Sequence, residues 1–184
     1  YMIRPVVSLE RLEFIEPEDR VGYRIGYKDG DQESMDYLEF SARDAISRWD
    51  SCRAYRRATS NTAAAFLEYM EKKFPFFIRA IQIDGGSEFM KNFEEACRQR
   101  RIRLFVIPPR SPKLQGCVER SNRTYREEFY EVEDIENQLE GHNRQLEEWN
   151  KTYNYIRPHQ SLGYLTPYEF YQNWLMEHNK AKCH

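Results

Sequence analysis

The first third of the chain alternates apolar and polar residues, which is the spacing of β-strands with one buried face. Two alternating runs cover residues 21–27 and 37–42, and residues 51–55 form a third, shorter candidate. A Lys-Asp-Gly-Asp turn signal at residues 28–31 follows the first run. We therefore predict three strands joined by hairpins into an antiparallel meander.

The pattern changes to the helical period over residues 59–74, where apolar side chains recur three or four positions apart. Pro75 ends this helix. Two apolar runs at residues 77–83 and 102–107 predict buried strands, separated by an amphipathic helix over residues 87–100. The remainder is predicted to be helical at residues 116–130 and 137–153, with a last helix that opens at Thr166-Pro167.

This order of elements predicts an α/β fold with a mixed five-stranded sheet flanked by helices. The 184 residues suit one domain with an ordinary core. Within it we assign residues 1–19 to an N-terminal extension and residues 20–135 to the core. Residues 136–184 are assigned to a C-terminal helical part of the same domain.

Two acidic residues stand in positions that suit a metal ligand. Asp84 closes an apolar strand and meets Gly85 and Gly86, which let the backbone turn at once. Glu119 follows a loop that contains proline and glycine, and it lies at the start of an amphipathic helix. Carboxylates delivered to one point from different elements suit a divalent-cation site for phosphoryl transfer. Glu88 is close to Asp84 in the chain, but we interpret it as a solvated residue of a first helical turn.

Basic and polar residues surround Glu119. They are Arg120 and Arg123 on the predicted helix, and Arg110, Lys113 and Gln115 in the irregular loop before it. Cationic side chains beside a metal-binding carboxylate suit contacts with phosphates, so these five residues are candidates for DNA binding. The alternative is a surface helix with ion pairs four residues apart, preceded by an ordinary connecting loop.

The charge of the chain limits the kind of nucleic-acid binding that is expected. The formal net charge is −2, which argues against a protein that coats DNA with an overall basic surface but allows local basic patches. The dense run Arg98, Arg100, Arg101 and Arg103 is interpreted as a solvated helix end rather than a nucleic-acid contact. The histidines are interpreted as structural or exposed, and His159 is the strongest exception because a turn can present it.

The cysteines and the hydropathy indicate the compartment. Cys52, Cys97, Cys117 and Cys183 are scattered, without zinc-site spacing, so we expect reduced thiols rather than disulfides or a zinc site. The sequence has no run of about 18 apolar residues and no charged-then-apolar leader. We therefore expect a cytoplasmic protein with no membrane partner.

Three segments together resemble a known family. They read IQIDGGSEFM, LFVIPPRSPKLQGCVERSNRTYREEFYEV and YNYIRPHQSLGYLTPYEFY. In this order they resemble the catalytic core of bacterial insertion-sequence transposases, a group related to retroviral integrases. That family carries an Asp-Asp-Glu triad on an RNase H-like fold. Residues 40–49 also look like the family's second strand, so the resemblance covers roughly residues 20–175.

The resemblance implies DNA transposition or integration. Family members use two Mg²⁺ or Mn²⁺ ions to cut transposon-end DNA and to join its 3′-hydroxyl to target DNA. By matching position, Asp84 is the second triad acid and Glu119 the third. The implied partners are DNA and further copies of the chain, in a homodimer or higher multimer. The aromatic residues Trp149, Tyr153, Tyr155 and Trp174 suit either such an interface or the core.

The first triad acid is where the chain departs from the family. The family spacing places this acid in the strand predicted at residues 21–27, at Arg24, and an arginine cannot ligate a divalent cation. Asp29 and Asp31 lie beyond that strand, in the turn. Asp44 belongs to the second strand, where we expect a structural hydrogen-bonding role.

Three functions are compared on this basis. The first is a metal-dependent transposase or integrase core that cleaves and joins DNA strands. The second is a transposase-derived DNA-binding domain that is catalytically impaired or inactive, as Arg24 suggests. The third, an RNase H-like nuclease, fits less well because the long C-terminal helices and the RPHQSLG segment match the integrase branch.

Overall fold

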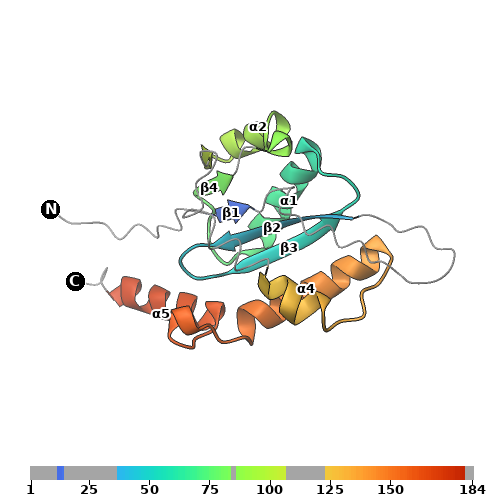
Figure 1. Ribbon diagram of the computed structural model, residues 1–184. Helices are drawn as coiled ribbons and strands as arrows, with labels where there is room; N and C mark the ends of the chain where they lie inside the picture. Colours follow the sequence, from blue (N-terminus) through green and yellow to red (C-terminus); the bar gives the residue numbers. More distant parts are fainter. Residues whose placement is uncertain (1–11, 15–36, 84–85, 107–122, 181–184) are drawn as a thin grey trace.

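A computed structural model describes residues 12–14, 37–83, 86–106 and 123–180 (Figure 1). Its strands are β1 (Leu12–Phe14), β2 (Leu38–Asp44), β3 (Asp50–Tyr55), β4 (Ala80–Ile83) and β5 (Arg103–Val106). Its α-helices are α1 (Ser60–Lys73), α2 (Asn92–Gln99), α4 (Leu139–Tyr155) and α5 (Pro167–Lys180). Shorter helical segments are η1 (Ser87–Phe89), the π-helix η2 (Arg126–Tyr130) and η3 (Gln160–Leu162).

The strands in the described part of the chain form one mixed sheet in the order β3-β2-β1-β4-β5. The first three strands pair antiparallel, whereas β4 is parallel to both β1 and β5. This mixture follows from the connections, because a tight turn can join only antiparallel neighbours such as β2 and β3. Parallel strands need a crossover, and α2 supplies one between β4 and β5. The predicted α/β class is confirmed.

The first strand lies at a different place in the chain from the predicted one. The strand that pairs with both β2 and β4 is β1, at Leu12–Phe14. The sequence pattern placed the first strand at residues 21–27, which lie outside the described ranges. The segment assigned to an N-terminal extension thus contains a strand of the sheet. A strand of three residues is too short to show a period of two, so alternation pointed to the longer run instead.

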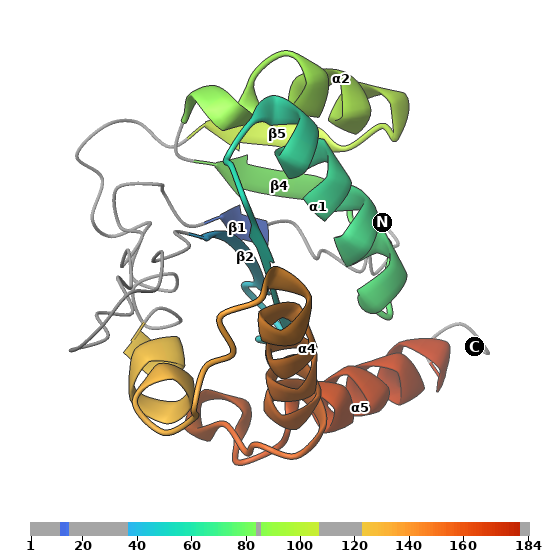
Figure 2. The same ribbon diagram turned by 90° about the vertical axis from the view of Figure 1, so that its right-hand side faces the viewer.

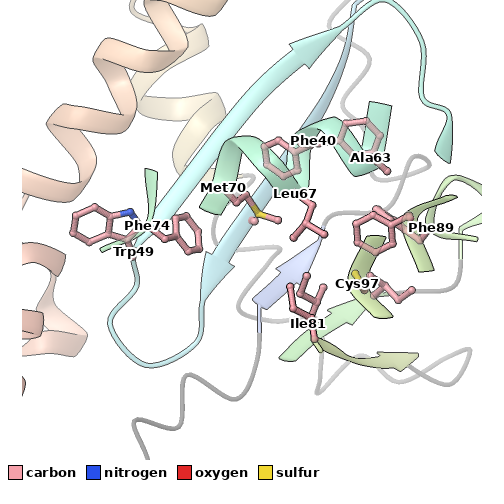
Figure 3. Packing of buried hydrophobic residues seen from close by; sticks show 14 residues of the cluster. Phe40, Trp49, Ala63, Leu67, Met70, Phe74, Ile81, Phe89 and Cys97 are labelled. Carbon is pink, nitrogen blue, oxygen red and sulfur yellow. The ribbon is translucent and has the colours of Figure 1, made fainter. Parts of the chain in front are cut away.

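One face of the sheet holds the main hydrophobic core. Figure 3 shows Phe40 of β2 and Ile81 of β4 packed with Leu67 and Met70 of α1. The buried residues of α1 recur at three- and four-residue intervals, which places them on one side of the helix. Thr59 caps this helix, since its hydroxyl accepts a hydrogen bond from the backbone N–H of Thr62 (3.2 Å). The core therefore joins α1 and α2 to the sheet (Figure 2).

A buried carboxylate closes the hairpin between β2 and β3. Oδ2 of Asp44 accepts hydrogen bonds from the backbone N–H (2.7 Å) and the hydroxyl (2.6 Å) of Ser47. The backbone N–H of Asp44 donates to the carbonyl of Trp49 (2.8 Å), and Arg48 turns the chain with φ +60°. Burial raises the pKa of the Asp44 carboxyl, although the hydrogen bonds from Ser47 oppose this shift. The expected structural role of Asp44 is confirmed.

Helix α4 packs against β3 on the other side of the sheet. Its asparagine side chains hydrogen-bond the backbone groups along the free edge of that strand. Asn154 accepts from the N–H of Asp50 (2.8 Å) and donates to its carbonyl (2.7 Å). Asn150 bonds Cys52 in the same way (3.2 and 3.0 Å), and Asn143 bonds Ala54 (2.8 and 3.0 Å). Each amide both donates and accepts, so the three side chains take the place of a neighbouring strand at this edge of the described sheet.

The hydrogen bonds at the edge of β3 predict how the loss of one asparagine amide changes the stability of the protein. We expect Asn150→Ala to lower the free energy of unfolding by about 2–4 kcal/mol, because the buried N–H and C=O of Cys52 lose their partner. Chemical denaturation measures this loss. Asn173→Ala, at an exposed position of α5, is the matched control and should change stability by less than about 0.5 kcal/mol. Equal stabilities of the two variants would contradict the proposed role of the amide.

Candidate functional site

The structure describes the surroundings of the candidate carboxylates rather than the carboxylates themselves. Asp84 and Glu119 lie outside the described residues, as do Arg110, Lys113, Gln115 and Arg120. Arg24, Asp29 and Asp31 lie outside them as well. What the structure defines is the strand that ends before Asp84 and the helical segment that follows Glu119.

The strand before Asp84 is an interior strand of the sheet. All residues of β4 are buried, and β4 runs parallel to β1 on one side and β5 on the other. The strand ends at Ile83. In α/β sheets, ligands bind beyond the carboxyl ends of parallel strands. The chain position of Asp84, directly after this end, thus agrees with the sequence argument for a site.

Glu88 differs from its prediction as a solvated residue. It lies in η1 and is buried, with 6% of its surface exposed. Its carboxylate lies against the backbone of Gly86, where an added Cβ would be 2.8 Å from Oε2. Amphipathic spacing alone did not indicate this, because exposure depends on what packs over the turn. A second, buried carboxylate therefore follows Asp84 by four positions in the chain.

Arg123 is the one DNA-binding candidate in the described ranges. Its guanidinium is exposed and pairs with Glu127, one helical turn later (Nε–Oε1 2.6 Å). Exposed pairs of this kind add little stability, so the arginine is accessible to other partners. This geometry fits both the ion-paired surface helix and a phosphate contact, and the DNA-binding assignment stays a prediction.

The segment after Glu119 is attached to the sheet by a buried tyrosine. The hydroxyl of Tyr125 donates to Oδ1 of Asp50 (2.7 Å) and also lies 3.0 Å from Oδ1 of Asn150. Oδ2 of the same aspartate accepts from Nε of Arg43 (2.6 Å). Burial, together with the nearby Asp50 charge, raises the pKa of the Tyr125 hydroxyl, so it stays protonated and donates. The tyrosine thus connects this segment to β3 and α4.

A second attachment comes from the segment after α4. Arg157 forms a two-point ion pair with Glu128, in which Nε lies 2.5 Å from Oε2 and Nη2 bonds Oε1. His159 is buried rather than presented by a turn, with 7% exposure, and its ring lies 4.6 Å from that of Tyr153. Burial and the Arg157 charge lower the pKa of His159 to about 4. The histidine is therefore neutral at pH 7 and structural.

Other candidate residues also have structural roles. Arg98 pairs with Glu95, and Arg100 pairs with Glu71 (2.8 Å) and Glu68 (3.5 Å), as expected for a solvated helix end. Tyr153 belongs to the core, whereas Tyr155 is 50% exposed.

The structure also describes two of the cysteines, the groups that could hold a metal ion and the helices that could span a membrane. Cys52 and Cys97 are free thiols and are buried, and burial raises the pKa of the Cys97 thiol to about 12. Among the described residues no cluster of His, Cys, Asp or Glu could hold a metal ion. No helix among them is long and apolar enough to cross a membrane.

Comparison with known proteins relates part of the chain to a known family. Residues 100–167 match the family model of the integrase core domain. This segment is similar to integrase core domains. It contains Glu119, the helical segment that follows it, and the RPHQSLG segment. The family resemblance drawn from the sequence is confirmed.

Similar proteins include mobile-element proteins. The "Putative integrase ORF3" of Spiroplasma virus SpV1-C74 is 31% identical over 110 residues, covering 53% of this chain and 30% of that protein. The "Insertion element IS476 uncharacterized 39.2 kDa protein" of Xanthomonas euvesicatoria is 30% identical over 102 residues, covering 55% of this chain and 29% of that protein. The chain thus spans less than a third of the length of these relatives.

A solved structure shares the fold. It is a chain in the cryoEM structure of the simian T-cell lymphotropic virus intasome in complex with PP2A regulatory subunit B56 gamma. The TM-score is 0.61 at 18% identity, and the match covers 81% of this chain and 49% of that chain. The integrase-like arrangement of sheet and helices therefore extends over most of the chain.

The low pKa of His159 predicts a pH dependence of stability. The unfolded chain takes up a proton near the ordinary value of 6.5, whereas the folded protein does so only near 4. The contribution of neutral His159 to stability is therefore complete above pH 6.5 and is lost as the pH falls toward 4, by about 3 kcal/mol in total and by about 2 kcal/mol between pH 7.5 and 5. In denaturation series at pH 7.5 and 5, His159→Gln should show a smaller difference between the two pH values than the parent. An equal difference would contradict this role of His159.

Proposed function

We propose that this chain is the core of a transposase or integrase that cleaves DNA and transfers DNA strands with the help of Mg²⁺ or Mn²⁺. The observation that carries the proposal is the integrase-core match over the segment that contains Glu119. The end of β4, an interior strand of a mixed sheet, directly before Asp84 supports it. We further propose that the fold is RNase H-like, that the partners are DNA and further copies of the chain, and that the protein acts in the bacterial cytoplasm.

In this proposal the two acids hold the metal ions. When bound, these ions lower the pKa of the attacking hydroxyl or water and stabilise the charge on the leaving oxygen. Asp84 and Glu119 are carboxylates, the oxygen ligands that Mg²⁺ and Mn²⁺ prefer. The residues proposed to hold the DNA backbone are Arg110, Lys113, Gln115, Arg120 and Arg123. The charges of the four basic residues among them would place a phosphodiester beside the carboxylates.

The two carboxylates predict the outcome of charge-neutralising substitutions. We expect Asp84→Asn and Glu119→Gln each to lower strand cleavage and joining by at least about a hundredfold, because each removes a ligand charge at the metal site. The assay uses the full-length protein and its end DNA in Mg²⁺ and in Mn²⁺. Asp134→Asn and Glu148→Gln, at exposed positions, are the matched controls and should keep full activity. Full activity of either site variant would refute the assignment.

The first acid of the triad has candidates near β1. Because β1 covers Leu12–Phe14, Arg24 lies ten positions beyond the end of that strand and need not occupy the triad position. Three glutamates lie within the strand or two positions from its ends: Glu10, Glu13 and Glu16. We propose that one of them supplies the first acid. A glutamate ligates a divalent cation as an aspartate does, with a longer reach.

Glu13 is also a candidate for a structural role inside the sheet. It stands in register with Arg43 on one side and with Gln82 on the other. In the described part of the chain, Nη2 of Arg43 and Nε2 of Gln82 are buried and have no hydrogen-bond partner. A loss of stability in Glu13→Gln without a specific loss of metal binding would assign Glu13 this structural role.

Substituting each glutamate in turn tests whether it supplies the first acid. The same assays distinguish an active core from an inactive one. If the proposal is right, Glu10→Gln, Glu13→Gln or Glu16→Gln weakens Mn²⁺ binding and lowers DNA joining by at least about tenfold, whereas Arg24→Gln does not. Isothermal titration with Mn²⁺ and the joining assay give the two readouts. Retained activity in all three variants would refute this source of the acid. A parent protein that binds end DNA but neither binds Mn²⁺ nor joins strands would instead support the DNA-binding alternative.

A further inference from the structure

The segment after Glu119 is held at two points by different parts of the fold. Tyr125 reaches β3 and α4 through Asp50 and Asn150, inside the protein. Three positions later, Glu128 meets Arg157, which follows α4. The first contact involves a fully buried hydroxyl, and the second a two-point ion pair whose side chains are 37% and 24% exposed.

The geometry of the ion pair fixes direction as well as distance. A guanidinium that meets a carboxylate through two parallel hydrogen bonds holds the two groups in one plane. The ring of Tyr153 lies 5.5 Å from the Arg157 guanidinium, so the arginine itself is supported from α4. The helical segment therefore cannot rotate about its axis without breaking one of the two contacts.

The segment itself is unusual. Residues 126–130 form a π-helix, a rare geometry that often occurs at functional sites. Phe129 is buried in it, and the hydroxyl of Tyr130 donates to Glu39 of β2. Tyr125, Phe129 and Tyr130 all pack into one hydrophobic cluster with Cys52 and Ala54 of β3 and Leu146 of α4.

From these contacts we infer that Tyr125, Glu128 and Arg157 are positioning residues for the Glu119 carboxylate. This inference rests on the proposed function. Glu119 precedes Tyr125 by six positions in the chain, so the contacts that fix Tyr125 and Glu128 limit where the preceding carboxylate can lie. Metal ligands must be held within about 0.5 Å of the productive geometry, and a misplacement of about 1 Å can cost about a hundredfold in rate. The role of Arg157 within the RPHQSLG-containing segment is then to position that carboxylate.

The main alternative is that the Arg157–Glu128 pair only stabilises the fold. The chain contains a matched control, the Arg100–Glu71 pair, on the α1 and α2 side of the sheet. Its side chains are 27% and 37% exposed, close to the 24% and 37% of the Arg157–Glu128 pair. A purely structural role predicts similar effects when either pair is broken.

The test compares Arg157→Ala and Glu128→Ala with Arg100→Ala in the full-length protein. Mn²⁺ affinity is measured by isothermal titration, DNA joining with end DNA, and stability by denaturation. We expect Arg157→Ala and Glu128→Ala to weaken both Mn²⁺ binding and joining by about 10–100-fold, at a loss of stability similar to that of Arg100→Ala, which keeps both functions. Tyr125→Phe, which removes only the hydroxyl, should weaken both in the same direction.

A charge swap and a conservative variant give the second readout. The double variant Glu128→Arg/Arg157→Glu should recover part of the Mn²⁺ affinity that either single change loses. Arg157→Lys, which keeps the charge but not the two-point geometry, should lie between the parent and Arg157→Ala. Mn²⁺ affinity and joining in Arg157→Ala equal to those of Arg100→Ala, in an active parent, would overturn the positioning role alone. A parent that neither binds Mn²⁺ nor joins DNA overturns the proposed function and this inference with it.

Discussion

The fold depends on how the free edge of β3 is satisfied. β3 is the last strand on its side of the sheet, so its outward N–H and C=O groups need partners that are not a strand. Asn143, Asn150 and Asn154 of α4 supply them, one amide for every second residue of the strand. A carboxamide is the neutral side chain that donates and accepts at once. These contacts fix α4 against the sheet, and α4 in turn positions the elements that pack against it.

The buried polar network around Asp50 adds a second constraint. Each oxygen of the buried Asp50 carboxylate has its own partner, Arg43 for one and Tyr125 for the other. A buried charge pair is tolerated when its geometry is good and further hydrogen bonds support it. The Asp50 network forms only when β2, β3, α4 and the segment after Glu119 are all in place. It therefore couples a candidate functional segment to the central architecture of the domain.

The helices and most strands could be predicted from the sequence because their apolar residues follow a regular period. The helix predicted at residues 59–74 corresponds to α1, and the strand at 102–107 to β5. The same reasoning missed β1, which is too short to have a period, and chose residues 21–27 instead. It also assigned Glu88 to the solvent and singled out His159 as the histidine that a turn can present, although both residues are buried. In each case the error concerned what packs over a residue, which local spacing does not encode.

By itself, the sequence determined the α/β class, the order of most elements and the resemblance to integrase cores, since these depend on local periods and on motifs of adjacent residues. It also named the carboxylates on which the proposed chemistry rests. Only the tertiary structure decided which strand lies beside β2, what the α4 asparagines bond, and how Tyr125 and Arg157 hold the segment after Glu119. The physical reason is distance along the chain. Asp50 and Asn154 meet across 104 positions, and such a pairing is selected by the packing of whole elements rather than by the residues next to either partner.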